Sequence, residues 1–539
     1  MLELNAKSVK ENAAQWQSAG VTLPRFDWAE MAAHTDAHPV WVHFGAGNIF
    51  RGFIARLQQE LLNQGLAQSG IIAADTFDYD IIDKIYLPHD NMTLNVTLNP
   101  DGTTSREIVA SIARGLRANS AEPDQMAQLK TIFLNPGLQM VSFTITEKGY
   151  ALRDMTGTLL PVVEADIQEG PDKARHAMSL VTALVHARYQ AGAAPLALVS
   201  MDNCSHNGEK LQNSVLTLAK AWLEQGFVEQ GFMDYLQDEH KITFPWSMID
   251  KITPRPHKMV EDSLVQAGIA GMAPIITSKN TFIAPFVNAE RPQYLVVEDK
   301  FPAGRPPLEK AGVYLTDRKT VNQTETMKVT TCLNPLHTAM SVYGCMLGYT
   351  LICEEMKDAD IVALIKRLGY VEGLPVVVDP GILSPKAFLD EVVEQRLPNP
   401  FMPDTPQRIA TDTSQKVGIR FGETIKSYLA AGRSLECLIS IPLAIAGWLR
   451  YLLAVDDEGN AIEVSSDPLK DELQAKLAGI TVGQPETYHG QLKDILANAA
   501  IFGSDLVQAG LATKIETMFV EQLAGPGAVR TTLHNYLFQ

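Results

Sequence analysis

Cysteine is scarce in this chain of 539 residues, and basic side chains are outnumbered by acidic ones. The five cysteines are an odd number without a CxxC pair, so neither a disulfide framework nor a structural zinc site is predicted. The 45 basic and 62 acidic residues leave a formal net charge of −17, which argues against nucleic acid and anionic membranes as partners. The polar N-terminus lacks the apolar run of a signal peptide, and a cytoplasmic location with reduced thiols is expected.

Long apolar runs are almost absent as well. Residues 436–455 approach the length of a membrane span, but Pro442 and Arg450 interrupt them. A charged side chain in the middle of a bilayer is unfavourable, so we predict a buried core helix here, with a membrane helix as the alternative.

Strand-like and helix-like segments alternate through roughly the first 315 residues, which predicts a doubly wound α/β sheet. The apolar segments that we expect to be buried parallel strands are 141–146, 195–201 and 294–299. The helices expected between them lie near 122–133, 171–191 and 208–226. Segments 91–99 and 105–112 alternate in polarity, which predicts a small insertion or an edge hairpin.

A glycine turn follows the first strand-like segment, at Val40 to Phe44. It reads GAGNIFRG over residues 45–52 and leads into a helix-like run. Two glycines at this spacing let a strand turn tightly into a helix and let backbone N–H groups approach a pyrophosphate. The third glycine of the common GxGxxG pattern is replaced by a phenylalanine. The residues predicted to contact the cofactor here are Gly45, Gly47, Asn48 and Arg51.

The next apolar segment, GIIAAD, ends at Asp75. In dinucleotide-binding units an acidic residue at the end of the second strand accepts hydrogen bonds from the ribose hydroxyls, and its charge repels the extra phosphate of NADP. Asp75 therefore predicts NAD as the cofactor. The alternative is that its side chain caps the segment that follows.

A Pro- and Gly-rich passage at 301–312 precedes a region of mostly amphipathic helices. A single hydrophobic core holds at most about 250–300 residues, so two large domains are expected in any case. We predict an N-terminal extension (1–38), a Rossmann-like NAD-binding domain (39–316) and a mainly α-helical C-terminal domain (317–539). The active site is expected in the cleft between the two domains.

A lysine, an asparagine and a histidine stand close together between Glu325 and His337. Asn334 precedes a proline and predicts a helix N-cap, which puts Asn334 and His337 about one turn apart. Lys328 lies just ahead of that helix. A buried lysine has a lowered pKa and its neutral amine can take a hydroxyl proton, while an asparagine can donate to a developing alkoxide. The set suits alcohol–carbonyl chemistry without a metal. A capping asparagine, a surface lysine and a core histidine are the alternative interpretation.

The spacing K-x5-N-x2-H resembles the signature of the polyol-specific long-chain dehydrogenases, the mannitol dehydrogenase family. Other segments resemble landmarks of that family in the same order, over roughly residues 38–520. These segments are GAGNIFRGF (45–53), TEKGY (146–150), SMDNCSHNG (200–208), SMIDKITP (247–254), VEDKFPAGRP (297–306), RIATDTSQK (408–416) and IAGWLRYL (445–452).

The resemblance implies catalytic roles for the matching residues. Lys328 is expected to be the general base in oxidation and the general acid in reduction. Asn334 and Asn203 are expected to stabilise the oxyanion, and His337 to bind the substrate. Glu325 resembles the family's glutamate that gates proton exit through water.

The resemblance also implies binding roles. Asp250 is expected to contact the sugar chain, Arg408 and Lys416 to bind substrate hydroxyls or a carboxylate, and Glu147 to belong to the cofactor site. The alternatives are a structural ion pair between Asp250 and Arg408, and a helix cap at Asn203.

Within the family the sequence is most similar to the D-mannonate oxidoreductase branch. This implies reduction of D-fructuronate to D-mannonate with NADH as the cofactor and no metal. A mannitol- or arabinitol-type polyol, or tagaturonate, is the alternative substrate. A nucleotide-binding sensor without catalysis is a hypothesis of a different class. A zinc alcohol dehydrogenase is disfavoured because Cys204 and His206 have no partners at metal-ligand spacing.

Overall fold

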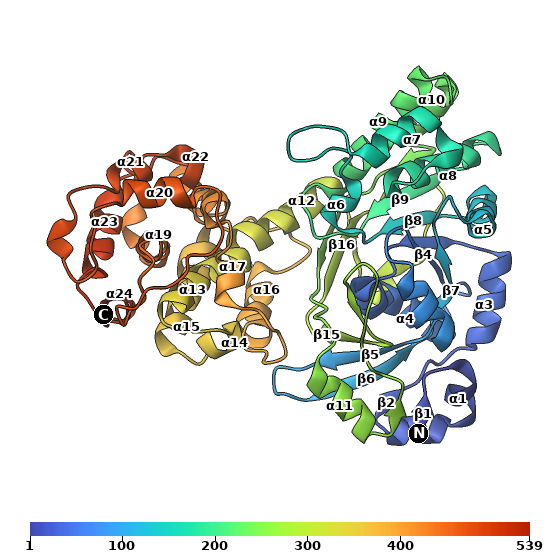
Figure 1. Ribbon diagram of the computed structural model, residues 1–539, viewed down its shortest axis with the longest axis horizontal. Helices are drawn as coiled ribbons and strands as arrows, with labels where there is room; N and C mark the ends of the chain where they lie inside the picture. The colour runs from blue at the N-terminus through green and yellow to red at the C-terminus, as the bar shows by residue number, and fades with distance from the viewer. Residues whose placement is uncertain (539) are drawn as a thin grey trace. The chain divides into compact units, whose positions relative to one another are not determined.

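The structure is a computed structural model that describes residues 1–538 and divides into two units (Figure 1). Unit 1 comprises residues 1–99 and 103–322. Unit 2 comprises residues 100–102 and the chain from residue 323 onward. Along the sequence, the boundary at residue 322 falls inside one helix, α12 (Arg318–Met327).

Unit 1 is built on a six-stranded parallel sheet with the strand order β10-β9-β8-β3-β4-β7. The strands are β3 (Trp41–Phe44), β4 (Ile71–Asp75), β7 (Ile112–Arg117), β8 (Met140–Phe143), β9 (Leu196–Ser200) and β10 (Ile242–Thr243). The chain runs outward from β3 through β4 to β7, then returns to β8 and runs outward on the other side. The predicted doubly wound sheet is confirmed, and its order reverses between β3 and β8, where such sheets bind nucleotides.

Helices lie against both faces of this sheet (Figure 1). They are α4 (Ala55–Asn63), α5 (Pro123–Leu134), α6 (Thr146–Tyr150), α7 (Pro161–Glu169), α8 (Ala177–Gln190), α9 (Asn207–Glu224) and α10 (Gln230–Gln237). The predicted helices near 122–133, 171–191 and 208–226 correspond to α5, α8 and α9.

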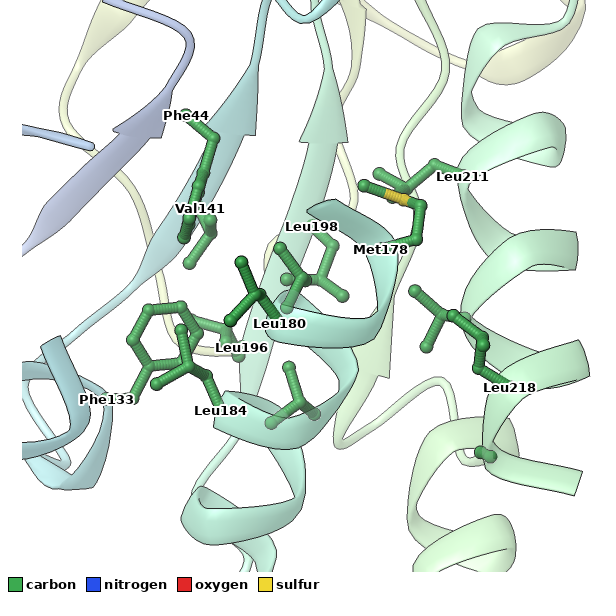
Figure 2. Packing of buried hydrophobic residues seen from close by; sticks show 14 of the residues in the cluster. Phe44, Phe133, Val141, Met178, Leu180, Leu184, Leu196, Leu198, Leu211 and Leu218 are labelled. Carbon is green, nitrogen blue, oxygen red and sulfur yellow. The ribbon is translucent and has the colours of Figure 1, made fainter. Parts of the chain in front are cut away.

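The core on one face of the sheet joins β8 and β9 to α8 and α9. Val141 and Leu198 of the strands pack in one cluster with Leu184 of α8 and Leu218 of α9 (Figure 2). Burying one such side chain stabilises the fold by about 1.5–3 kcal/mol. Because helices cover both faces, every residue of β3, β4, β8 and β9 is buried, which is why these strands were recognisable as mostly apolar runs.

Smaller sheets complete unit 1. The predicted hairpin is confirmed as antiparallel β5 (Thr93–Leu98) and β6 (Thr104–Val109). Its predicted edge position is wrong, because β15 and β2 flank it in a four-stranded sheet with the order β15-β5-β6-β2. The predicted strand at 294–299 exists as β16 (Tyr294–Glu298), but it lies outside the six-stranded sheet. It pairs antiparallel with β11 (Ser247–Asp250) and parallel with β17 (Tyr314–Thr316). An apolar run indicates burial on both faces and does not identify the neighbouring strand.

Residues 1–38 take part in the sheets of unit 1. They form the helices α1 (Ala6–Glu11), α2 (Ala13–Ser18) and α3 (Trp28–Ala37). β1 (Leu2–Glu3) pairs with β12 (Ile269–Ala270), and β2 (Val21–Thr22) pairs with β6. The remaining elements of unit 1 are α11 (Lys258–Gln266), β13 (Ile275–Ile276), β14 (Phe282–Ile283) and β15 (Phe286–Glu290).

Unit 2 is mainly helical, as predicted (Figure 1). Its α-helices after α12 are α13 (Asn334–Met346), α14 (Ile352–Glu355), α15 (Ala359–Lys366), α16 (Pro385–Glu391), α17 (Pro406–Ile409), α18 (Glu423–Ala430), α19 (Ser440–Tyr451), α20 (Lys470–Lys476), α21 (Lys493–Leu496), α22 (Ala499–Phe502), α23 (Ala512–Glu521) and α24 (Ala528–Leu537).

The apolar run at 436–455 forms the buried helix α19, as predicted. Every residue of α19 is buried, and the helix packs against α13 and α23. Arg450 is accommodated because its guanidinium donates to the backbone carbonyls of Gln522, Val455 and Asp456. In the described chain, residues 1–538, no helix has both the length and the apolar character needed to cross a bilayer.

Candidate functional site

The glycine turn lies at the carboxyl end of β3, beside the end of β8. Gly45 has a φ of 101°, and a Cβ there would lie 2.1 Å from the carbonyl oxygen of Thr144, so only glycine fits. At Gly47 a Cβ would meet no atom within 4 Å. Gly45 is therefore required by packing within the chain, whereas Gly47 borders open space that a ligand can enter.

Asp75 ties this turn to the end of β4. Its Oδ2 accepts from the N–H of Ala46 at 2.9 Å, and its Oδ1 accepts from the N–H groups of Phe77 and Asp78, both at 2.8 Å. The carboxylate is 8% exposed. Burial raises its pKa, and the three backbone hydrogen bonds act in the opposite direction. A carboxylate has about four acceptor positions, so these bonds leave about one for a ribose hydroxyl.

Arg51 is completely buried beneath the turn. Its guanidinium donates to the carbonyl oxygen of Ala284 at 2.8 Å and to the side-chain oxygen of Asn48 at 2.9 Å. Burial lowers its pKa to about 10, so it stays charged at neutral pH. Its partners in these two bonds are neutral, and a buried cation here favours an anion at the turn.

The end of β8 is held in a strained conformation. Thr146, a β-branched residue, has a φ of 65°, which is an outlier for such a side chain. The carboxylate of Asp202, after β9, fixes it by accepting from the N–H groups of Ile145 and Thr146, both at 2.9 Å. Glu147 follows with an exposed side chain that forms an ion pair with Lys210 of α9. Sequence reasoning missed Asp202, although it stands beside Asn203 in the SMDNCSHNG segment.

The turn after β9 carries the predicted residue Asn203, which is exposed. The N-cap of α9 is His206, so Asn203 is not the cap of that helix. Within residues 1–538, no group of three or more His, Cys, Asp and Glu side chains is arranged to hold a metal ion, so Cys204 and His206 belong to none.

Asp250 is buried at the end of β11. Two hydrogen bonds join the start of β11 to the beginning of α9: Asn207 donates from its side-chain amide to the Ser247 hydroxyl at 3.0 Å, and the N–H of Ser247 donates back to Asn207 at 3.0 Å. The two sequence segments SMDNCSHNG and SMIDKITP are thus fixed to each other, and they carry Asn203 and Asp250.

Lys328 of unit 2 begins a π-helical turn, Lys328–Cys332, which continues α12. The lysine is 3% exposed. Turns of this kind are rare and often mark functional positions. Glu325 lies three residues earlier in α12 and is half-buried, which places it on the same helical face as Lys328.

The predicted helix after Lys328 is α13, but the predicted N-cap is wrong by one residue. α13 begins at Asn334, and Leu333 stands at the cap position without a capping side chain. The π-helical turn runs directly into α13, because the N–H of Leu333 donates to the carbonyl of Lys328 at 3.1 Å. The side chain of Asn334 therefore does not cap the helix. His337 lies three residues further along α13.

His337 is surrounded by cationic side chains of unit 2. Burial lowers its pKa to about 4, the Asp404 carboxylate opposes that shift, and the guanidinium groups of Arg396, Arg420 and Arg408 add to it. The imidazole is therefore neutral at physiological pH. We call these three arginines together with Lys416 the cationic cluster. Sequence reasoning missed Arg396 and Arg420.

Two members of the cationic cluster come from elements that pack against α13. α17 carries Arg408, and the π-helical turn Gly418–Gly422 carries Arg420, which donates to the hydroxyl of Thr338. The side chain of Arg408 is 65% exposed and forms an ion pair with Asp404. Both residues of this pair belong to unit 2, whereas Asp250 belongs to unit 1. Lys416 donates to the backbone carbonyls of Ile409 and Thr411, and burial lowers its pKa.

The strand order and the glycine turn define a nucleotide-binding fold of the Rossmann type. Residues 40–310 match the mannitol dehydrogenase Rossmann domain, and residues 320–523 match the mannitol dehydrogenase C-terminal domain. The chain belongs to the mannitol dehydrogenase family, which confirms the family predicted from the sequence.

Relatives in this family match over nearly the whole chain. The D-mannonate oxidoreductase of Thermotoga maritima is 49% identical, over 99% of this chain and 98% of its own. The mannitol 2-dehydrogenase of Pyrenophora tritici-repentis is 31% identical, over 87% of this chain and 76% of its own. Among solved structures, the Pseudomonas fluorescens mannitol 2-dehydrogenase in a ternary complex with NAD and D-mannitol has a TM-score of 0.69 and 25% identity, with 99% of both chains covered.

Alanine substitution should affect stability at one glycine of the turn and cofactor binding at the other. Gly45→Ala should lower the free energy of unfolding by at least about 2 kcal/mol, since it combines a left-handed backbone with a clash against Thr144. Gly47→Ala should leave stability unchanged within about 0.5 kcal/mol. It should nevertheless weaken NADH binding, because the methyl group enters the space open to the ligand. Urea unfolding and NADH fluorescence titration measure the two effects. Tight NADH binding by Gly47→Ala would contradict the placement of the phosphates.

Proposed function

We propose that this protein is an NAD-dependent oxidoreductase of the cytoplasm that reduces D-fructuronate to D-mannonate with NADH. Three findings support the proposal: the family, the 49% identity to a D-mannonate oxidoreductase, and the relative solved with NAD. The five cysteines are free thiols, as expected in a reducing compartment.

We assign NAD binding to unit 1. The residues at the turn fit a dinucleotide, since Gly47 leaves open space and the buried Arg51, oriented by Asn48, supplies positive charge below it. The helix that starts after Gly47 adds its N-terminal N–H groups and its dipole. Asp75 contributes by fixing the turn and offers one acceptor position to the ribose. Glu147 follows the strained Thr146 at the end of β8, on the nicotinamide side of the switch point.

We assign proton transfer to Lys328. Bound NADH supplies the hydride, and the ketone oxygen of the substrate becomes an alcohol that needs one proton. A lysine buried at a π-helical turn can hold that proton at its Nζ and donate it as the oxyanion develops. Asn334 and Asn203 donate amide hydrogens to that oxygen, and Glu325 exchanges the proton of Lys328 with solvent. Asp250 accepts from a hydroxyl of the sugar chain.

The cationic cluster is the observation that favours a sugar acid over a neutral polyol. Three arginines act on His337, and Lys416 stands next to two of them. A neutral imidazole can bind a hydroxyl group but carries no charge, and within the cluster Asp404 pairs with Arg408. The carboxylate of a hexuronate adds a further negative charge beside these cations, and it forms strong charge-assisted hydrogen bonds with guanidinium groups.

A substrate panel tests this specificity. NADH oxidation at 340 nm should be fastest with D-fructuronate, and its kcat/KM should exceed that for D-fructose by at least about 100-fold, which corresponds to roughly 3 kcal/mol from a paired carboxylate. D-Tagaturonate and fructose 6-phosphate complete the panel. Preference for fructose would assign the enzyme to neutral polyols, and Arg408 and Lys416 would then bind hydroxyl groups.

Removal of the proposed general acid should slow turnover strongly and leave the affinity for the cofactor unchanged. Lys328→Ala should lower kcat by about 10²–10⁴-fold, the usual contribution of a general acid or base. The Kd for NADH should stay within about two-fold of wild type, because the lysine belongs to unit 2. Lys426→Ala, which removes an exposed lysine of α18, is the control. Wild-type turnover by Lys328→Ala would exclude the assignment.

Replacement of His337 should change the rate and leave the pH dependence alone. With a pKa of about 4, the imidazole is predominantly uncharged above pH 5, so it contributes no titration midpoint between pH 5 and 8. His337→Gln keeps a neutral hydrogen-bonding group and should lower kcat/KM by about 10–100-fold through lost substrate contacts. The pH profiles of kcat/KM should be parallel. Loss of an inflection near pH 6.5 in the variant would show that the histidine titrates in the wild type.

A further inference from the structure

The stretch that follows β4 contains an exposed aromatic ring. In a doubly wound sheet the adenosine half of the dinucleotide lies over the end of the second strand. Asp75, the acid at that position, uses most of its acceptor capacity on backbone N–H groups. Other groups near Asp75 must therefore provide most of the contact with the adenosine.

Phe77 is the nearest such group. Its N–H donates to Asp75, so its backbone lies against the proposed ribose position. Its side chain is 61% exposed, although phenylalanine is usually buried. The face of a purine is apolar and aromatic, and it stacks on rings of this kind.

Lys279 lies beside this ring, on the turn between β13 and β14. Its ammonium is 5.1 Å from the centre of the Phe77 ring. The turn is fixed to the stretch after β4 by three bonds: the hydroxyls of Thr277 and Thr281 donate to Asp78, the former at 2.7 Å, and the N–H of Ser278 donates to Asp80 at 2.8 Å. The position of Lys279 is thus set by the same segment that carries Phe77.

The charges around Lys279 leave it available to a ligand. Asp80 is paired with Lys84, and Asp78 accepts from the hydroxyls of Thr277 and Thr281. No salt bridge within residues 1–538 includes Lys279, which is exposed. Its ammonium contacts the Phe77 ring.

We propose that Phe77 and Lys279 form the adenosine subsite of the cofactor site, an inference that rests on the proposed NAD-dependent function. The adenine stacks on Phe77, and the ammonium of Lys279 faces the 2′ position of the ribose. Asp75 still disfavours a 2′-phosphate, so NADH is preferred. Lys279 partly offsets that repulsion, so the enzyme also accepts NADPH.

Nucleotide binding by surface variants tests the subsite. Phe77→Ala should raise the Kd for NADH and for ADP-ribose about 10-fold each, since stacking on one ring is lost, while Phe77→Trp should restore binding. The value of kcat at saturating NADH should change little, because the adenosine end takes no part in the chemistry. Phe538→Ala removes a similarly exposed phenyl ring, 53% exposed in unit 2, and is the control.

Lys279→Ala should act selectively on the phosphorylated cofactor. The Kd for NADPH should rise about 10-fold and that for NADH less than two-fold, as expected for one charge–phosphate contact. Lys220→Ala, which removes an exposed lysine of α9, is the control. Equal effects on both cofactors, or none, would overturn the role of Lys279.

The outcomes separate this inference from the proposed function. If the wild type binds NADH and reduces the sugar acid while Phe77→Ala binds NADH as tightly as wild type, the subsite is wrong and the function stands. If the wild type binds neither NADH nor NADPH, both are wrong. Because both side chains are exposed, thermal unfolding of the variants should match wild type.

Discussion

The hydrogen bonds of Asp75 are the constraint on which the nucleotide end of unit 1 depends. One buried carboxylate holds the N–H of Ala46 in the glycine turn and two N–H groups after β4. It joins the ends of two neighbouring strands at the point where a phosphate must approach. An unpaired buried carboxylate would be unfavourable, and the three donors remove that penalty. Because these bonds use most of the acceptor capacity of Asp75, it is not mainly a ribose ligand. Residues near Asp75 must then provide most of the contact with the adenosine.

The opposite side of the switch point is held in the same way. Asp202 binds two N–H groups at the end of β8 and keeps Thr146 in a left-handed conformation. Its pKa is raised by burial and lowered by the hydroxyl of Tyr150 and these backbone bonds. Two carboxylates, the buried Asp75 at the end of β4 and the half-buried Asp202 just after β9, therefore shape the loops on which a cofactor would lie. Rigid support of this kind reduces the loop ordering that binding would otherwise require.

Local patterns in the sequence were sufficient to predict the fold class and the glycine turn. The strands β3, β4, β8 and β9 are continuous apolar runs, and Gly45 has a conformation that only glycine adopts easily. The partner of β16 was not predictable, because pairing is a long-range property. The start of α13 was misplaced because Asn334-Pro335 is typical of a cap, whereas the π-helical turn before it changes the entry of the chain.

The parts of the site that the sequence did not predict are those made by residues far apart in the chain. Arg396 and Arg420 come from separate turns, and only their common lowering of the His337 pKa shows that they act on one site. Asp202 was not predicted because its neighbour Asn203 is the residue of that segment with an expected catalytic role. The catalytic candidates could be named because they share one short segment, and segments of that kind carry the resemblance to a family.

Net charge and local charge act separately in this protein. The chain as a whole is acidic, with a formal net charge of −17, and would repel a small anion at long range. That repulsion is screened over about 8–10 Å at physiological ionic strength. Inside unit 2, the cationic cluster acts on the half-buried His337, where screening by salt is weaker than at the surface. Under the proposed function, binding of a sugar acid therefore depends on the arginines that act on His337 more than on the overall charge. Burial is the main cause of the lowered His337 pKa and the arginines add to it, so the residue that is proposed to orient the substrate is neutral and adds no charge to the cluster.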